Sequence, residues 1–398
     1  MNKYLLFFAI LFIQSYANII EVNPGQNGAY ITIQDGIDAA SYGDTVLVHD
    51  GTYSGEGNRN LTWNGDSKHI TLMSVNGPES TIIDAQGWND GVDSQPSRRV
   101  FVFDNSGQNS NDIIDGFTIR NGYLDGSDGH QNGGGIFIYN TSPTFTNCII
   151  RDNKTFRNCH NCDLRGGGIY LYNSSSSFTN CQILNNEIRS EVSYGGDRDA
   201  WARGGGVHVD AGNVSFTNCD FKYNTAYVYD YHDHGDSRGY AYGGGLHRWG
   251  GGTLTLTDVE FSSNAVDGGG HHYDREGGGI YIYDGTTNIN NSTIVYNTFQ
   301  GLFRYDGTVN VNSSIIWYNG SDDYGSINYY YTNRQASPPS GDGNISLVPW
   351  LFDPENEDYS LSPGSVCINR GNPSWDDPDG TRRDMGKYIY EHGHFGPE

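Results

Sequence analysis

Short runs of alternating apolar and polar residues recur along the middle of the chain, without the three-to-four-residue spacing of an amphipathic helix. In residues 136–139, Ile136 and Ile138 would point to one side and Phe137 and Tyr139 to the other. Glycine and asparagine separate such runs, and both residues favour turns. The pattern therefore predicts short β-strands joined by turns.

These runs belong to a repeat. A glycine triplet followed by an aliphatic residue begins at Gly133, Gly166, Gly204, Gly243 and Gly277, with a degenerate copy at Gly301. An asparagine closes each unit: Asn153, Asn186, Asn224, Asn264, Asn297 and Asn319. The aliphatic residue and this asparagine are 17 positions apart in five units and 18 in one, whereas the distance to the next aliphatic residue varies from 5 to 22. Each unit thus has a fixed body and one variable insertion, always at the same corner.

A fixed body of this length, built from short strands and turns, matches one coil of a parallel β-helix. Two inward rows are expected, one of Ile150, Ile183, Phe221, Phe261, Ile294 and Ile316, and one of Cys148, Cys181, Cys219 and Val259. The cysteines of the second row are interpreted first as small buried residues and only second as a disulfide pair. The closing asparagines should adopt left-handed turns and hydrogen-bond from coil to coil through their amides.

The two ends of the chain differ from the repeat. Residues 1–17 combine Lys3, an apolar run and small residues at 15 and 17, which predicts a secretory signal peptide. Residues 18–345 should form the β-helix, with a short amphipathic capping helix within residues 30–40 and a first strand at 43–48. Residues 346–398, punctuated by proline and glycine, should cap the other end.

Composition narrows the class of partner. The net charge of −24 argues against nucleic acid and anionic membrane surfaces. No apolar run after residue 17 is long enough to span a bilayer, so we expect no membrane insertion. We also expect the protein to be a monomer. Six cysteines are too few for a disulfide scaffold in 398 residues, and Cys159 and Cys162 are better suited to a local disulfide than to a metal site.

The chain resembles secreted proteins of the right-handed parallel β-helix superfamily, the pectin-lyase-like fold. The resemblance rests on Thr-Ile-Gln-Asp-Gly-Ile-Asp-Ala-Ala at 32–40, on 43–48, and on Asp-Tyr-Ser-Leu-Ser-Pro-Gly-Ser at 358–365 with 367–371. The glycine-triplet and Phe-x-x-Asn pair is also similar to polymorphic outer-membrane protein repeats. The resemblance implies an all-β, right-handed solenoid. It implies no single activity, because the superfamily includes lyases, hydrolases, epimerases and non-enzymatic adhesins.

The insertions at 154–165, 187–203, 225–242 and 265–276 should stack into the wall of a groove. Beside them, the outward positions of one strand form two stripes: Phe137, Tyr170, His208, His247, Tyr281, Phe303, and Tyr139, Tyr172, Asp210, Trp249, Tyr283, Tyr305. Adjacent coils lie about 4.8 Å apart, so each stripe should be a continuous exposed strip. Flat rings with hydroxyl rims suit sugar rings.

We expect any catalytic residues to lie at the centre of these two stripes. The candidate catalytic residues are His208 and His247 as stacked neighbours, with Asp210 and Arg248, because a histidine can act as general base and an arginine can stabilise a carboxylate. The candidate substrate-binding residues are Tyr170, Tyr172, Trp201, Arg203, His232, His234, Trp249, Arg275, Tyr281 and Tyr283. The alternative is that His208 and His247 merely continue an aromatic ladder. Arg248 falls on the inward phase of its strand, so the alternation could slip there.

The excess of acidic over basic residues also suggests calcium as a cofactor. Its ligands would be Asp230, Asp233 and Asp236, or Asp376, Asp377 and Asp379. Neither set matches a complete calcium loop, and solvated acidic loops are the competing interpretation.

The sequence as a whole predicts a secreted, extracellular or cell-surface protein that binds an extended polysaccharide or cell-surface glycan. Catalysis as a polysaccharide lyase, an epimerase or a glycoside hydrolase is left open. The competing class is a non-catalytic adhesion protein, and the third is a purely structural solenoid.

Overall fold

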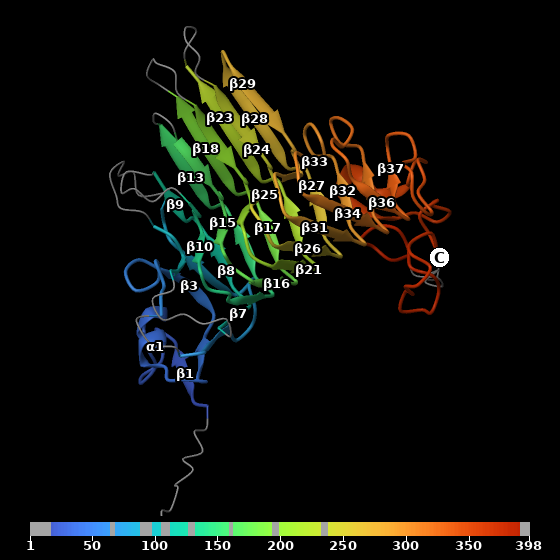
Figure 1. Cartoon of the computed structure of the whole chain (residues 1–398). Helices are drawn as coiled ribbons and strands as arrows, with labels where there is room; N and C mark the ends of the chain where they lie inside the picture. Colours follow the sequence, from blue (N-terminus) through green and yellow to red (C-terminus); the bar gives the residue numbers. More distant parts are fainter. Residues whose placement is uncertain are drawn as a thin grey trace, which may run out of the picture.

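The computed structural model describes residues 17–63, 68–87, 98–104, 112–125, 132–158, 162–192, 199–231 and 238–390. Nearly all regular structure is parallel β-strand, and the strands stack coil upon coil into an elongated solenoid (Figure 1). This confirms the predicted right-handed parallel β-helix. Of the predicted signal peptide only Ala17 lies within the described residues. No helix in the described part of the chain is long and apolar enough to cross a membrane.

Three parallel sheets, A, B and C, form the faces of the solenoid. Sheet A contains β1 (Ile19–Val22), β2 (Thr45–Val48), β4 (Thr71–Ser74), β7 (Ile113–Asp115), β11 (Thr144–Thr146), β16 (Ser177–Thr179), β21 (Val214–Thr217), β26 (Thr253–Thr257), β31 (Thr286–Asn290), β34 (Thr308–Asn312) and β36 (Asn328–Tyr330). Sheet B contains β3 (Gly51–Ser54), β5 (Thr81–Asp84), β8 (Thr118–Arg120), β12 (Ile149–Arg151), β17 (Gln182–Leu184), β22 (Asp220–Lys222), β27 (Glu260–Ser262), β32 (Thr293–Val295), β35 (Ile315–Trp317) and β37 (Asn333–Arg334). Sheet C contains β6 (Phe101–Phe103), β10 (Ile136–Tyr139), β15 (Ile169–Tyr172), β20 (Val207–Asp210), β25 (Leu246–Trp249), β30 (Ile280–Ile282) and β33 (Leu302–Arg304).

The variable insertions all lie between sheet B and sheet C, as the repeat arithmetic predicted. Each one runs outward as a strand of sheet D and returns as a strand of sheet E, and together the two sheets form a flange that projects from the solenoid (Figure 1). Sheet D contains β9 (Tyr123–Leu124), β13 (Lys154–Asn158), β18 (Glu187–Val192), β23 (Thr225–Asp230) and β28 (Ala265–Gly270). Sheet E contains β14 (Cys162–Arg165), β19 (Ala200–Arg203), β24 (Gly239–Tyr242) and β29 (Tyr273–Glu276).

The flange is held together by its own apolar layer. Small and aliphatic side chains fill the space between sheets D and E: Cys162, Leu164, Ile188, Ala200, Ala202, Ala226, Val228, Ala241 and Val266. The described strands of the insertions therefore form two packed sheets rather than separate loops, because alternate residues of each strand find apolar partners across the layer.

The core of the solenoid consists of the predicted inward rows. Ile150, Ile183 and Phe221 align in register with Phe261, Ile294 and Ile316, and all are buried. Their rings stack where they meet, as at Phe221 and Phe261, whose centroids are 4.2 Å apart. Burying one such side chain stabilises the fold by about 2–3 kcal/mol.

The row of Cys148, Cys181 and Cys219 is buried and its thiols are free, which confirms the first interpretation of these residues. Each thiol donates to a carbonyl of the preceding coil, as from Cys219 Sγ to Phe178 O at 3.5 Å. Cys162 is in a disulfide, whereas its predicted partner, Cys159, lies outside the described residues.

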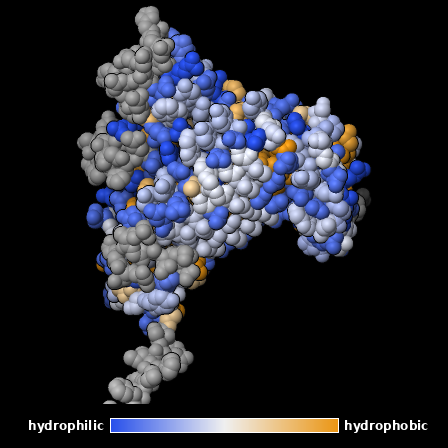
Figure 2. Space-filling view, in the orientation of Figure 1, coloured by the Kyte–Doolittle hydropathy of each residue, from blue (hydrophilic) through white to orange (hydrophobic). Residues whose placement is uncertain are grey.

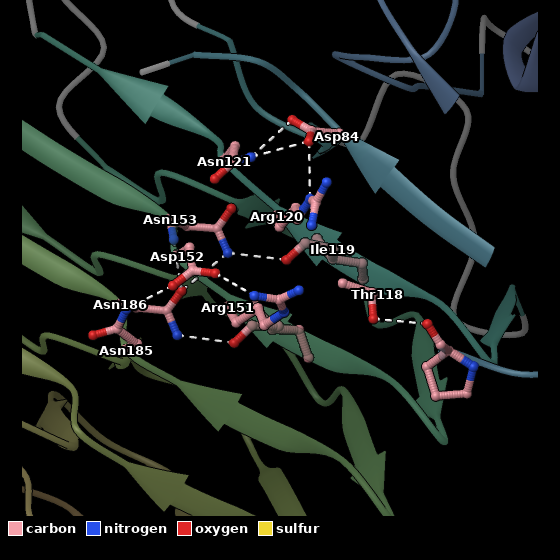
Figure 3. A network of polar contacts seen from close by, with 12 residues as sticks. Asp84, Thr118, Ile119, Arg120, Asn121, Arg151, Asp152, Asn153, Asn185 and Asn186 are labelled. Atoms are coloured by element: carbon pink, nitrogen blue, oxygen red, sulfur yellow. Dashed lines mark hydrogen bonds and ion pairs between the residues drawn. The ribbon is translucent and has the colours of Figure 1, made fainter. Parts of the chain in front are cut away.

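The closing asparagines form a continuous ladder at the corner where the chain leaves sheet B (Figure 3). Asn186 Nδ2 donates to Asn224 Oδ1 at 3.0 Å and to Ile150 O at 2.9 Å, and Asn186 Oδ1 accepts from the Asn153 backbone N–H and Nδ2. The coil-to-coil bonding was predicted correctly, but the predicted left-handed conformation was wrong by one residue. It falls on the preceding residue of each unit: Asp152, Asn185, Tyr223, Ser263, Tyr296 and Tyr318.

The glycine triplets turn the chain from sheet E into sheet C. Gly204 has a φ of 77°, which other residues rarely adopt. A Cβ on Gly205 would collide with the carbonyl oxygen of Gly244 in the next coil. The first glycine of each triplet therefore serves the turn, and the second serves close packing between coils.

The N-terminal end carries the predicted cap. Helix α1 (Ile33–Ala39) begins after Thr32, whose side chain accepts a hydrogen bond from Asp35 N, and it buries Ile33 and Ile37 against the solenoid. The first strand, however, is β1 rather than the segment after the helix, because residues before the cap pair in parallel with β2.

The C-terminal segment packs along the side of the solenoid. We expected a cover for the open end, yet Cys367 and Met385 contact Ile315 and Trp317 on the outer face of sheet B. Farther along, Lys387 pairs with Asp220 and the Tyr388 hydroxyl donates to Glu260. The strands β38 (Leu351–Asp353) and β39 (Asp358–Leu361) form an antiparallel pair at the start of this segment.

Replacing Asn224 by alanine should lower the free energy of unfolding by about 2–4 kcal/mol, since several buried groups of two neighbouring coils lose their partner. Urea denaturation followed by circular dichroism measures this. Asn328→Ala is the matched control, because Asn328 makes a similar amide contact to Asn310 on an exposed strand. Equal destabilisation by both changes would contradict a special role for the buried ladder.

Candidate functional site

Sheets C and E meet along a line, since each strand of sheet E enters sheet C through a glycine triplet. The strand registers define two outward rows on each sheet. On sheet C they are Phe137, Tyr170, His208, His247, Tyr281, Phe303 (the inner row) and Tyr139, Tyr172, Asp210, Trp249, Tyr283, Tyr305 (the outer row). On sheet E they are Asp163, Trp201, Tyr240, Asp274 and Arg165, Arg203, Tyr242, Glu276.

The inner row of sheet C is buried over most of its length, so the prediction that it is an exposed strip was wrong. Tyr170, His208, His247, Tyr281 and Phe303 are all at most 4% exposed. Side chains of sheet E cover the middle of the row, where the Tyr242 ring stacks on Tyr281 with centroids 4.6 Å apart. At its end, Tyr324 stacks on Phe303 with centroids 4.7 Å apart. The row thus forms an apolar contact layer between the solenoid and the flange. Tyr170 and Tyr281, which we expected to bind substrate, are buried in this layer and do not reach the surface.

His208 and His247 lie in the middle of this contact layer. Their rings stack with centroids 4.8 Å apart, and both are fully buried. Neither imidazole has a hydrogen-bond partner among the described residues. Burial lowers the pKa of both histidines well below the usual value, and nearby arginines lower it further. They are neutral members of an aromatic ladder, which is the alternative the sequence left open, and their burial removes them from any contact with a surface ligand.

Arg248 occupies an inward position of β25, in register with Val209 and Ile282. The alternation does not slip. The side chain instead reaches the corner after the strand, where Nη2 donates to Gly251 O and to Gly212 O. Burial lowers its pKa to about 10, although Asp210 and Asp284 oppose this shift. The arginine predicted to be catalytic therefore has a role in holding the corner.

The outer row of sheet C remains accessible, with Tyr139 39% and Tyr305 62% exposed and Tyr172, Trp249 and Tyr283 half-buried. Its rings stack on one another: centroids are 4.7 Å apart for Tyr139 and Tyr172, 3.9 Å for Trp249 and Tyr283, and 5.0 Å for Tyr283 and Tyr305. The ring faces therefore cover each other, and the row offers ring edges and tyrosine hydroxyls to a ligand rather than the open ring faces that we expected. No hydrogen bond within the described residues uses the hydroxyls of Tyr139, Tyr172, Tyr283 or Tyr305.

Asp210 interrupts the outer row between Tyr172 and Trp249. Its Oδ2 lies 2.6 Å from Arg165 Nη1, and this ion pair bridges sheet E and sheet C. Burial raises the pKa of the Asp210 carboxyl, and the Arg165 charge opposes that rise. Asp210 is the one candidate catalytic residue that the structure places beside the accessible row.

The charges of the two sheets form one cluster. Arg165 also donates to Asp163 through Nε at 3.2 Å and through Nη2 at 2.7 Å, and Arg203 Nη1 contacts the other oxygen of Asp163. The Arg203 guanidinium lies 4.9 Å from the Trp249 ring centre and 5.4 Å from that of Trp201. The predicted residues Trp201, Arg203 and Trp249 are thus brought together, along with Asp210.

Other predicted residues are elsewhere. Arg275 aligns with Ala241 and points to the D side of the flange, where it contacts Phe299 and Asp267. His232 and His234 lie outside the described residues.

Three residues of the cluster were missed: Asp163, Arg165 and Tyr242. The sequence does contain a pattern that could have indicated them. Small residues alternate with large ones in Ala-Trp-Ala-Arg at 200–203 and Gly-Tyr-Ala-Tyr at 239–242, which is typical of a strand with one packed and one open face.

The calcium sets receive no support from the geometry. Asp377 accepts from Arg383 and from the backbone of Asp384, and Asp379 accepts from Thr381. Among the described residues no group of three or more His, Cys, Asp or Glu side chains is arranged to hold a metal ion. Asp233 and Asp236 lie outside those residues.

Comparison with known proteins identifies the fold. Residues 155–337 match a family model described as a right handed beta helix region. Similar solved structures include pectate lyase Pel9A (15% identity, 95% of this chain and 97% of that chain covered, TM-score 0.49), a rhamnogalacturonan lyase (12%, 93% and 96%, 0.47) and pectin methylesterase from carrot (13%, 78% and 87%, 0.44). No curated protein matches the chain. At these identities no residue role is carried over.

The buried histidines make a testable contribution to pH dependence. Their folded-state pKa is depressed, so the unfolded chain binds more protons below its histidine pKa of about 6.5. Stability is therefore complete above that pH and falls as the pH drops below it, by about 1.4 kcal/mol for each histidine at about pH 5.5.

The double variant His208→Phe/His247→Phe should lose this part of the slope in urea denaturation between about pH 7.5 and pH 5.5. His271→Phe/His272→Phe is the matched control, because both of these histidines are exposed. An unchanged slope in the first variant would show that the buried pair is not responsible.

Proposed function

We propose that this right-handed parallel β-helix protein binds an extended polysaccharide along the outer row of sheet C and the adjoining face of sheet E. The observation that carries the proposal is the row itself: partly exposed rings in five of its six coils, with tyrosine hydroxyls that have no protein partner in the described structure. We call this surface, made of Tyr139, Tyr172, Trp249, Tyr283 and Tyr305 with Trp201 and Tyr240, the aromatic surface.

The aromatic surface has the chemistry of a sugar-binding surface. Ring edges offer apolar contact, and hydroxyls can donate to and accept from the hydroxyls of a sugar. The groups recur at the coil spacing of about 4.8 Å, which is comparable with the length of one pyranose residue in an extended chain. Because the rings are fixed by their strands and by each other, little side-chain entropy is lost on binding. Figure 2 shows hydrophilic residues over much of the flange, as expected beside a polar ligand.

The secreted location follows from the predicted signal peptide and stays part of the proposal, as does a monomeric state. A glycan of a cell wall or cell surface is the partner that such a location offers. A non-catalytic adhesion protein would use the same surface for the same contact, so binding alone fits both classes.

Removal of hydroxyls should weaken binding without changing the rings. In the triple variant Tyr172→Phe/Tyr283→Phe/Tyr305→Phe, the loss of three hydrogen bonds of about 0.5–1.5 kcal/mol each should lower the affinity at least about tenfold. Affinity electrophoresis in gels containing a panel of polysaccharides measures this.

The matched control is Tyr223→Phe/Tyr296→Phe/Tyr318→Phe, because these tyrosines are also exposed but lie at the corner after sheet B. If both triple variants bind like the unchanged protein, the aromatic surface is not the binding surface.

A second candidate function is catalysis at Asp210, favoured by its place in the middle of the row and by the burial that raises its pKa. A carboxyl group in this position could act as general acid or base in a hydrolase, lyase or epimerase, with Arg165 as its charge partner.

On a polysaccharide that binds, Asp210→Asn should lower product release at least about a hundredfold while the affinity changes less than about threefold. Reducing-end and unsaturated-uronate assays measure turnover. Asp342→Asn, at an exposed aspartate next to Tyr331 after β36 of sheet A, is the control. If the unchanged protein binds a polysaccharide but releases no product, catalysis at Asp210 is contradicted and the adhesion function remains.

A further inference from the structure

The two arginines beside the rings of Trp201 and Trp249 are already engaged by carboxylates. Arg165 uses Nε and Nη2 on Asp163 and Nη1 on Asp210, so its whole fork is occupied. Arg203 contacts Asp163 through Nη1, its Nε is buried, and its guanidinium lies close to the rings of Trp201 and Trp249. Neither arginine presents a free fork to a carboxylate of a ligand.

Most of the other charges are negative, and the exception is Arg238, which directly precedes β24 and interacts with Tyr240. Asp274 and Glu276 end the two outward rows of sheet E, and the exposed Asp284 and Asp306 directly follow Tyr283 and Tyr305. Between β15 and β33, six carboxylates line the two sheets: Asp163, Asp210, Asp274, Glu276, Asp284 and Asp306. Asp199 and Arg238, neighbours just before β19 and β24, add one charge of each sign. With the inward-pointing Arg248 and Arg304 also counted, and with Arg275 paired to Asp267 on the D side, five cations face seven anions.

An anionic polymer would lose binding free energy at this surface in one of two ways. It would either break the ion pairs of Arg165 and Arg203 or place its own charge beside exposed carboxylates such as Asp274 and Asp284, and like charges brought together at an interface cost several kcal/mol. The net charge of −24 adds long-range repulsion of the same sign. A neutral polymer meets neither cost, because hydroxyl groups and ring edges are what the outer row offers.

We propose that the ligand of this surface is a neutral polysaccharide, free of uronate and sulfate groups, and that Asp163 and Asp210 act as specificity residues by holding both arginines in ion pairs. This inference rests on the proposed function and names the ligand class for the same surface.

The decisive experiment uses ligands that differ only in their charge. Polygalacturonate and alginate are each compared with the same polymer after chemical reduction of its carboxylates to primary alcohols, alongside neutral galactan, mannan and xylan. Affinity electrophoresis of the full chain should show at least about tenfold tighter binding to a neutral polymer than to any uronate polymer. Binding to the neutral polymer should change less than about twofold when salt is raised, because no ion pair is formed or broken with the ligand.

The variant Asp163→Asn/Asp210→Asn frees the two arginines and should gain affinity for the uronate polymers at low salt. Asp274→Asn/Asp284→Asn/Asp306→Asn, at exposed positions outside the ion pairs of Arg165 and Arg203, should show a smaller gain in the same direction and keeps the test valid if the first variant does not fold.

The outcomes separate the two proposals. Tighter binding of the unchanged protein to a uronate polymer than to its reduced form overturns the neutral-ligand inference and leaves the polysaccharide function in place. Preference for a reduced or neutral polymer supports both. Absence of binding to every polymer in the panel overturns the proposed function and this inference with it.

Discussion

The structure depends on one buried ladder of asparagine amides. At the corner after sheet B, each amide donates to a carbonyl of the preceding coil and to the amide oxygen of the next, and it accepts a backbone N–H, as at Asn186 and Asn224. Buried polar groups are costly unless all of them are paired, so this ladder allows only one register between neighbouring coils. The fixed register is the reason that equivalent residues stack in rows, inside as core and outside as aromatic ladders. The same corner is where every insertion departs, so the ladder also aligns the strands of the flange.

The flange divides the aromatic excess of the chain into two rows with different roles. The inner row of sheet C, including His208 and His247, is buried as the contact layer to sheet E. The outer row stays accessible and is joined to the flange by the ion pair of Arg165 with Asp210 and by Arg203 beside Trp249. Solenoid and flange therefore present one rigid surface, whose side chains are held by stacking and by ion pairs before any ligand arrives.

The charge arrangement gives this surface a chemical character that the fold alone would not imply. Here, the arginines beside the rings are neutralised by Asp163 and Asp210, and further carboxylates flank the row. This local electrostatic pattern is the basis for our proposal of a neutral glycan.

The sequence by itself determined the coil, its 17-position body, the corner of insertion, the inward rows and the in-register neighbours, because these follow from a short period and from alternation within strands. It also brought Trp201, Arg203, Asp210 and Trp249 into one region. The tertiary structure alone decided that the insertions form sheets D and E, that sheet E covers His208 and His247, that Arg275 points to the D side, and that Arg248 reaches a corner. Alternation tells which residues share a face of a strand. Whether that face meets solvent depends on a second layer that pairs across distant parts of the chain, and no local pattern records it.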